Sequence, residues 1–284
     1  MRPVLPPRTL QELHTFEIKP KKAFAFNFKE LVDYSELLYF FAWRDIKVKY
    51  KQTVLGFLWA VLQPLLLMLI FTFFIGRAMQ VSSDGMDYAV FAYSGLVLWL
   101  VFSSGVTNAA NSMVTNAAII KKIYFPRLII PVSAVVVALF DFIMAFVIFI
   151  VILLIFATPI NLSLIYWWPL ALLLTIVGTV GPGCLLAALN IKYRDFRYVV
   201  PFLIQALLFL TPVIYPVSSI SLVWLRYVVA LNPMYAAISV FRLPLSTVAP
   251  DWTLLVISLS SGVLFFIIGL AYFRRTENYF ADIA

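Results

Sequence analysis

The sequence is poor in the side chains that enzymes and metal sites use. It contains one cysteine, Cys184, and one histidine, His14, among 284 residues. A single cysteine excludes an intrachain disulfide framework and a thiolate metal cluster, and one histidine leaves little for metal coordination. None of the ten glycines is followed by lysine, so the phosphate-binding loop GxxxxGK[ST] is absent. We therefore expect no metal site, no redox function and no cofactor bound by this chain.

Charged residues are also scarce. They make up 12% of the chain, whereas 63% of its residues are hydrophobic. Soluble domains carry about 25% charged and about 45–50% apolar residues. This composition predicts an integral membrane protein. The formal net charge is +8, but the excess cations lie beside apolar segments, which favours anionic lipid headgroups and a cytoplasmic protein partner over nucleic acid.

Six apolar stretches approach the length of about 20 residues that a helix needs to cross a bilayer. They are 55–75, 88–106, 129–156, 168–188, 199–214 and 254–273, the fifth being the shortest. Eighteen of the 21 Lys and Arg residues lie in the N-terminal segment, the second and fourth loops and the C-terminal end, and three lie in the other loops. Because positive charge is retained in the cytoplasm, we expect both termini there. The predicted fold is all-α, with six transmembrane helices in one membrane domain, 29–284.

A further apolar stretch, 220–240, lies between the fifth and sixth of these segments. It is interrupted by Arg226, Asn232 and Pro233. A seventh span there would place Arg274 and Arg275 outside, against the charge bias. A re-entrant outer hairpin keeps both termini on one side and tolerates proline where protein covers the backbone. We therefore predict a hairpin before the last span.

The segment before the first span has two parts. Residues 1–28 contain four prolines among scattered charges and no short apolar core, so we expect a cytoplasmic extension rather than a secretory signal. Residues 30–51 have the spacing of a two-faced helix that lies in the headgroup plane, although packing on a soluble domain is the ordinary alternative. The apolar side carries Leu31, Tyr34, Leu38 and Phe41, and the charged side includes Arg44, Lys47 and Lys51.

Asp141 is the one ionisable residue in the middle of a predicted span. A carboxylate at the bilayer centre costs about 2.5–3.5 kcal/mol on insertion scales, so it must face protein or water. It is a candidate for a pore-lining group or a proton relay, but a hydrogen-bonded packing role is slightly favoured because a relay usually needs further acids. The sequence leaves these roles open.

Aromatic residues are abundant, with 26 Phe, 14 Tyr and 7 Trp. Many of them fall at the ends of predicted spans, where anchoring in the membrane interface is the usual role. Sugar rings also stack on aromatic side chains, so a polysaccharide pore would use such residues. Composition does not separate these two roles.

Four segments in a fixed order resemble the permeases of type-2 ABC exporters for polysaccharides. They are FAWRDIKVKYKQTVLGFLWAVLQPL (41–65), NAAIIKKIYFPRLIIP (116–131), LNIKYRDFRYVVPFLIQALLFLTPVIYP (189–216) and LNPM (231–234). The resemblance covers roughly residues 30–280 and is strongest to lipid-linked O-antigen export permeases, with teichoic acid and capsule exporters as near relatives. It implies a permease in the bacterial inner membrane that moves a lipid-linked polysaccharide and forms a homodimer with two copies of a separate cytoplasmic ATPase, which holds ATP and Mg²⁺.

The resemblance also implies roles for particular segments. The coupling helix that meets the ATPase falls on 116–127, the interface helix on 30–51 and the outer hairpin on 218–242. Charged and polar residues of the second and fourth loops are candidates for contact with the ATPase or with the pyrophosphate of a lipid carrier, although setting the topology alone explains them equally well. These candidates are Asn116, Lys121, Lys122, Arg127, Lys192, Arg194, Asp195 and Arg197.

Two other functions fit a membrane protein of this kind. A membrane-embedded glycosyl or phosphoglycosyl transferase is disfavoured because acids and histidine are scarce. An ion-coupled flippase would depend on Asp141 and usually needs further acids. We therefore expect a transport subunit rather than an enzyme.

Overall fold

The computed structural model describes residues 32–51, 56–277 and 280. These residues form helices and no β-strand. The α-helices are α2 (Ser35–Lys51), α3 (Leu58–Phe71), α4 (Tyr88–Thr115), α5 (Ala117–Ile120), α6 (Ile129–Ile155), α7 (Leu164–Lys192), α8 (Phe196–Leu210), α9 (Val223–Ala230), α10 (Pro233–Arg242) and α11 (Trp252–Thr276). A π-helix, η1 (Thr72–Ala78), continues α3, and a short 3-10 helix, η2 (Val217–Ser219), follows α8. The all-α membrane fold is as predicted.

Five helical segments in the described part are long and apolar enough to cross a membrane: α3 with η1, α4, α6, α7 and α11. They correspond to five of the six predicted spans. The remaining one, 199–214, is represented by α8, which has only 15 residues. At 1.5 Å per residue α8 is about 22 Å long, less than the hydrocarbon core of about 30 Å. It ends where Thr211 takes an extended conformation before Pro212, as residues that precede proline usually do.

The predicted bend before the last span is present. Helices α9 and α10 meet at an angle of 95°, as in a broken span or a re-entrant loop. Asn232 and Pro233 make the break: the Asn232 side chain accepts a hydrogen bond from the amide of Met234, and Pro233 occupies the first turn of α10, where no amide donor is needed. The polar residue and the proline that interrupt the apolar stretch therefore form the corner of this hairpin.

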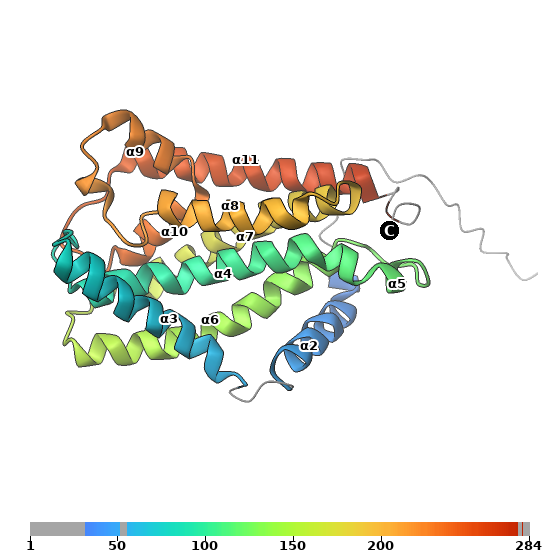
Figure 1. Cartoon of the computed structure of the whole chain (residues 1–284), viewed down its shortest axis with the longest axis horizontal. Coiled ribbons are helices and arrows are strands. Elements are labelled where there is room, and N and C mark those ends of the chain that lie inside the picture. The colour runs from blue at the N-terminus through green and yellow to red at the C-terminus, as the bar shows by residue number, and fades with distance from the viewer. Residues whose placement is uncertain (1–31, 52–55, 278–279, 281–284) are drawn as a thin grey trace, which may run out of the picture.

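Helix α4 lies at the centre of the bundle (Figure 1). It packs against α6 and α7 and also contacts α3, α8 and α10. Tyr93 and Phe149, on α4 and α6, stack with ring centroids 6.0 Å apart, and Trp168 and Phe241, on α7 and α10, stack at 5.3 Å. These rings belong to one large apolar core that holds α10 inside the molecule.

Helices α7 and α11 approach each other closely at two glycines. A Cβ atom on Gly269 would lie 2.0 Å from the carbonyl oxygen of Gly181, and one on Gly181 would lie 2.5 Å from the Cα atom of Phe266. Both helices run unbroken through this contact, and α7 also contains Pro169 and Pro182. Only residues without a side chain permit this backbone approach.

Helix α2 packs along α6 near α5 (Figure 1). Of its predicted apolar side, Phe41 is buried, Leu38 is partly buried, Tyr34 is exposed, and Leu31 lies outside the described residues, as does the extension 1–28. Arg44 differs from the expectation of a solvent-facing charge: its guanidinium donates a 2.8 Å hydrogen bond to Asn116 Oδ1, next to the end of α4. Helical periodicity cannot predict a contact between two residues that are so far apart in the sequence.

Candidate functional site

A row of polar side chains follows one face of α4. Ser104, Asn108, Asn111 and Thr115 recur at spacings of three or four residues, which places them on one side of a helix. Helix α4 contains no charged residue over its whole length. The row is therefore polar and uncharged, and it runs along the most enclosed span of the described bundle.

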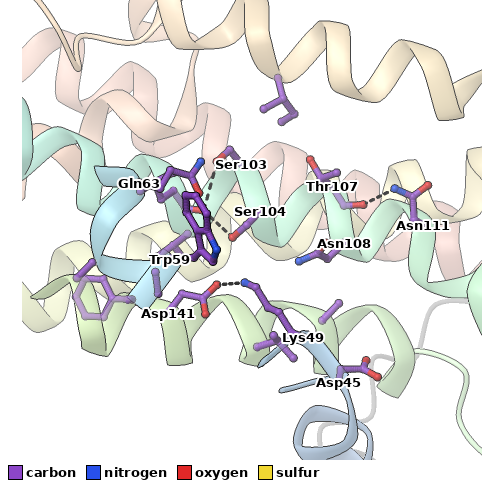
Figure 2. Close-up of a pocket in the computed structure, with 18 of the residues that line it drawn as sticks. Asp45, Lys49, Trp59, Gln63, Ser103, Ser104, Thr107, Asn108, Asn111 and Asp141 are labelled. Carbon is purple, nitrogen blue, oxygen red and sulfur yellow. Dashed lines mark hydrogen bonds and ion pairs between the residues drawn. The ribbon is translucent and has the colours of Figure 1, made fainter. Parts of the chain in front are cut away.

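This polar face lines a cavity of about 860 Å³ between α2, α3, α4, α6 and α8. Figure 2 shows its side chains opposite Trp59 and Gln63 of α3 and opposite Lys49 and Asp141 of α2 and α6. The uncharged polar residues of the wall are Gln63, Ser103, Ser104, Thr107, Asn108, Asn111, Ser112, Thr115, Asn116 and Gln205. A polar cavity among helices of this apolarity is the feature most typical of a transport path in a membrane protein.

Most hydroxyl donors along α4 are used by the helix itself. The hydroxyls of Ser103 and Ser104 donate to the carbonyl of Leu100, and that of Thr115 donates to the carbonyl of Asn111. The Asn111 amide donates to the carbonyl of Thr107 and its oxygen accepts from Asn190 at 3.1 Å. A hydroxyl that donates to its own helix keeps its oxygen lone pairs free to accept, so this wall presents acceptors to hydroxyl-bearing molecules.

Aromatic side chains share the cavity with these amides and hydroxyls. Trp59 of α3 is 49% exposed and Tyr50 is partly buried, and Trp99 and Phe142 also reach the lining. The structure thus places some of the abundant aromatic residues at a polar cavity, and one of them, Trp59, also lies at the start of a span. Flat rings beside hydrogen-bonding groups offer the two kinds of contact that sugars make.

The charged residues of the cavity wall occur in pairs. The Lys49 ammonium and the Tyr50 hydroxyl both donate to the carboxylate of Asp141. Arg44 pairs with Asp45 at 2.7 Å. Burial, followed by the hydrogen bond and charge of Asp141, raises the pKa of Tyr50, which therefore stays protonated as a donor. The structure places the pore candidate Asp141 on the cavity wall, where it also holds α2 against α6.

The hairpin of α9 and α10 is anchored by Arg242, which is 8% exposed. Its guanidinium donates to the hydroxyl of Ser94 and to the carbonyls of Phe91, Pro212 and Val213 at 2.8–3.0 Å. It also lies 3.6 Å from the centre of the Phe91 ring. One arginine thus joins α10, α4 and the segment after α8. Nothing in the local sequence distinguishes Arg242 from Arg226, so this role could not be predicted.

The residues expected at the ATPase contact have different environments. Lys121 and Lys122 are exposed, next to Ile123 and to Tyr124, which is 86% exposed. Asn116 is buried, accepts from Arg44 and donates to the carbonyl of Ser112, so its side chain is engaged inside the molecule. The fourth-loop residues are all exposed: Lys192, Arg194, Asp195 and Arg197.

Arg127 joins the second loop to the end of α11. Its guanidinium donates to the main-chain carbonyl of Glu277, and its amide donates to the Glu277 carboxylate at 3.1 Å. Arg274 pairs with the same carboxylate at 3.0 Å. Phe280 lies next to this junction in sequence and is fully buried against Phe273. Arg127 therefore stabilises the packing of the C-terminal segment in addition to any contact with a partner.

Within the described residues, no three His, Cys, Asp or Glu side chains are grouped so as to hold a metal ion. Asp84 instead accepts a hydrogen bond from the hydroxyl of Ser218 at 2.7 Å. Asp251 caps α11 by accepting from the amides of Thr253 and Leu254. Both acids therefore have structural partners.

The fold and the cavity together define a multi-pass membrane protein with a polar path among apolar helices. The family model of the ABC-2 type transporter matches residues 36–245, and the chain belongs to this family of transporter permeases. The names of curated relatives agree with this family assignment. The chain is similar to an O-antigen export system permease protein RfbA of Klebsiella pneumoniae, with 30% identity over 240 residues, which are 84% of this chain and 92% of the relative.

Two further relatives extend this comparison. An O-antigen export system permease protein RfbA of Myxococcus xanthus is 29% identical over 215 residues, which cover 75% of this chain and 82% of the relative. A polysialic acid transport protein KpsM of Escherichia coli is 25% identical over 247 residues, which cover 83% and 91%, respectively. The relatives therefore extend along most of the membrane domain described here.

Proposed function

We propose that this chain is the membrane permease of an ATP-driven exporter that moves a lipid-linked polysaccharide of the O-antigen type across the bacterial inner membrane. The observation that carries the proposal is the polar cavity of about 860 Å³ along α4, in a chain of the ABC-2 family. The names of the relatives support a polysaccharide as the substrate. The sequence contains no GxxxxGK[ST] loop, so ATP and Mg²⁺ belong to a separate cytoplasmic ATPase subunit.

The proposed assembly contains two copies of this permease and two ATPase subunits. Helices α3 and α8 flank the cavity and are the least covered of the apolar helices: α3 buries only Pro64 and Met68, and α8 only Val200. A second copy would cover these helices and complete the cavity wall. Native mass spectrometry of the detergent-purified complex tests this stoichiometry, and a single permease per complex would contradict it.

The proposed orientation places α5, the loop between α7 and α8, and the end of α11 in the cytoplasm. These parts lie at one end of the bundle (Figure 1), and they carry most of the loop cations, including Lys121, Lys192 and Arg275. Positive charge at one end of a membrane protein marks its cytoplasmic side. There the exposed second and fourth loops are available to the ATPase, and α2 would lie at the membrane surface.

Reconstitution tests the function. The chain is copurified with its ATPase, placed in vesicles and supplied with a lipid-linked glycan and ATP. We expect glycan movement that requires both subunits and stops when the ATPase carries a substitution of its phosphate-binding lysine. Glycan transfer by the isolated chain would favour a transferase, and transport driven by an ion gradient without ATP would favour a flippase.

A further inference from the structure

The cavity wall carries no net charge. Its four charged side chains form the pairs Arg44–Asp45 and Lys49–Asp141, so each cation has a carboxylate as its partner. Segment 52–55 lies outside the described residues, and its sequence, QTVL, contains no charge. The unpaired cations Lys121 and Lys122 are in the cytoplasmic loop and do not line the cavity.

The remaining polar groups of the wall are amides and hydroxyls. The most exposed of them include Gln63, Asn108, Thr115 and Gln205, which come from three different helices. Amides donate and accept hydrogen bonds at once and can follow a chain of hydroxyl groups as it moves. They do little to compensate a full negative charge, because a desolvated carboxylate needs a cation or several donors to replace its hydration.

The helices that bound the cavity bring no further charge to its wall. Helices α3 and α4 contain no charged residue, α6 contains only Asp141, and α8 contains only Arg197, at its cytoplasmic start. Helix α2 also carries Glu36, Lys47 and Lys51, and these three side chains do not line the cavity. A second copy of the same chain would contribute an equally uncharged wall. A polyanion would therefore cross the apolar part of the bundle without the cations that buried anions require.

We propose that the polymer exported through this cavity consists of uncharged, hydroxyl-rich sugar units and that the cavity discriminates against acidic polysaccharides. This inference rests on the proposed function and specifies its substrate class. The sugar chain passes between the amides of α3, α4 and α8.

The first test compares two polymers of equal length in vesicles that contain the permease and its ATPase. One is a lipid-linked neutral hexose polymer, and the other is the same polymer after oxidation of its primary hydroxyls to carboxylates. We expect the neutral polymer to move at least about tenfold faster, because each carboxylate adds a desolvation cost. An equal or higher rate for the carboxylated polymer would overturn the inference and leave the proposed export function intact. Movement of neither polymer, with ATP hydrolysis intact, would overturn the export function and the inference with it.

The second test changes the charge of the wall at Asn108, an exposed position on α4 that faces the cavity. Asn108→Asp and Asn108→Lys are compared for export of the lipid-linked polymer extracted from the source bacterium, each variant serving as the control for the other. For an uncharged chain we expect the two rates to agree within about twofold, because neither sign of charge attracts the cargo. A rate that is about tenfold lower for the Asp variant than for the Lys variant is the result expected of a polyanion path and would contradict the inference. Copurification of the ATPase with each variant establishes that both complexes assemble.

Discussion

The Lys49 ammonium and the Asp141 carboxylate form an ion pair that joins α2 to the middle of α6. Tyr50 donates to the same carboxylate, so two consecutive residues at the end of α2 converge on one acid. The pair faces the cavity, and its side chains are 41% and 18% exposed. Asp141 therefore contributes both to the polar wall and to the position of α2, next to the proposed cytoplasmic contacts.

The strength of this pair can be measured with a double-mutant cycle. Lys49→Met, Asp141→Asn and the double variant are compared by unfolding in detergent. Because Lys49 is partly exposed, solvent screens the pair, and we expect a coupling energy of about 1 kcal/mol or less that falls further at high salt. Strictly additive effects of the two substitutions would mean that the ion pair does not stabilise the docking of α2.

Export by Asp141→Asn separates a packing role from a proton relay. Asparagine keeps the size and the acceptor oxygen of aspartate, so the hydrogen bond from Tyr50 is retained. We expect ATP-driven export to fall by less than about tenfold and not to respond to collapse of the proton gradient, since weakening one partly exposed ion pair is a small perturbation. Complete loss of export, together with sensitivity of the native protein to the gradient, would favour the ion-coupled mechanism.

Replacement of Arg242 should destabilise the outer hairpin severely. Arg242→Lys keeps the charge, but a single ammonium cannot reach both the acceptors on α4 and the carbonyl of Pro212. We expect Arg242→Gln and Arg242→Lys each to lower the free energy of unfolding by about 3–5 kcal/mol, the usual effect of breaking a buried network of this kind. Thermal unfolding in detergent measures the loss.

Arg77 provides the matched control for Arg242. It is an exposed arginine at the outer end of η1, and Arg77→Gln should change the stability by less than about 0.5 kcal/mol. Equal effects of the two substitutions would show that the anchoring bonds of Arg242 add nothing to stability.

The glycine contact between α7 and α11 predicts a sharp difference between two alanine substitutions. Gly269→Ala places a methyl group against the carbonyl of Gly181, where only backbone movement relieves the clash. We expect a loss of about 1–3 kcal/mol, as for other overpacked sites. Gly178→Ala, on α7, meets Pro233 at an ordinary 3.4 Å and should change the stability by no more than about 1 kcal/mol. Equal unfolding temperatures for these two variants would contradict the close approach.

The sequence predicts the spans and the hairpin well because both depend on local properties. Hydropathy locates the apolar helices, and the distribution of Lys and Arg predicts an even number of membrane crossings. Asn232 with Pro233 marks the bend. The polar row on α4 is also visible as a spacing pattern in SSGVTNAANSMVTN (103–116), but it contains no charged residue to mark it as a site. The partners of Arg242 could not be predicted, because three of the four are backbone carbonyls up to 151 positions away and have no signature in side-chain identity.

The last prediction concerns the two kinds of cation in the second loop. Lys121 and Lys122 are exposed, whereas Arg127 binds Glu277 at the end of α11. We expect the double reversal Lys121→Glu with Lys122→Glu to lower export per ATP hydrolysed without changing the unfolding temperature, because these side chains contact only solvent or a partner. Arg127→Glu should lower both, since it places a second carboxylate beside Glu277 and removes bonds to the C-terminal segment; the stability loss should be about 1–3 kcal/mol. Glu277→Gln is the control for the structural part, because it weakens the same junction while leaving the loop cations in place. Normal coupling in the Lys121 and Lys122 variant would remove these residues from the ATPase contact and leave them the role of retaining the loop in the cytoplasm.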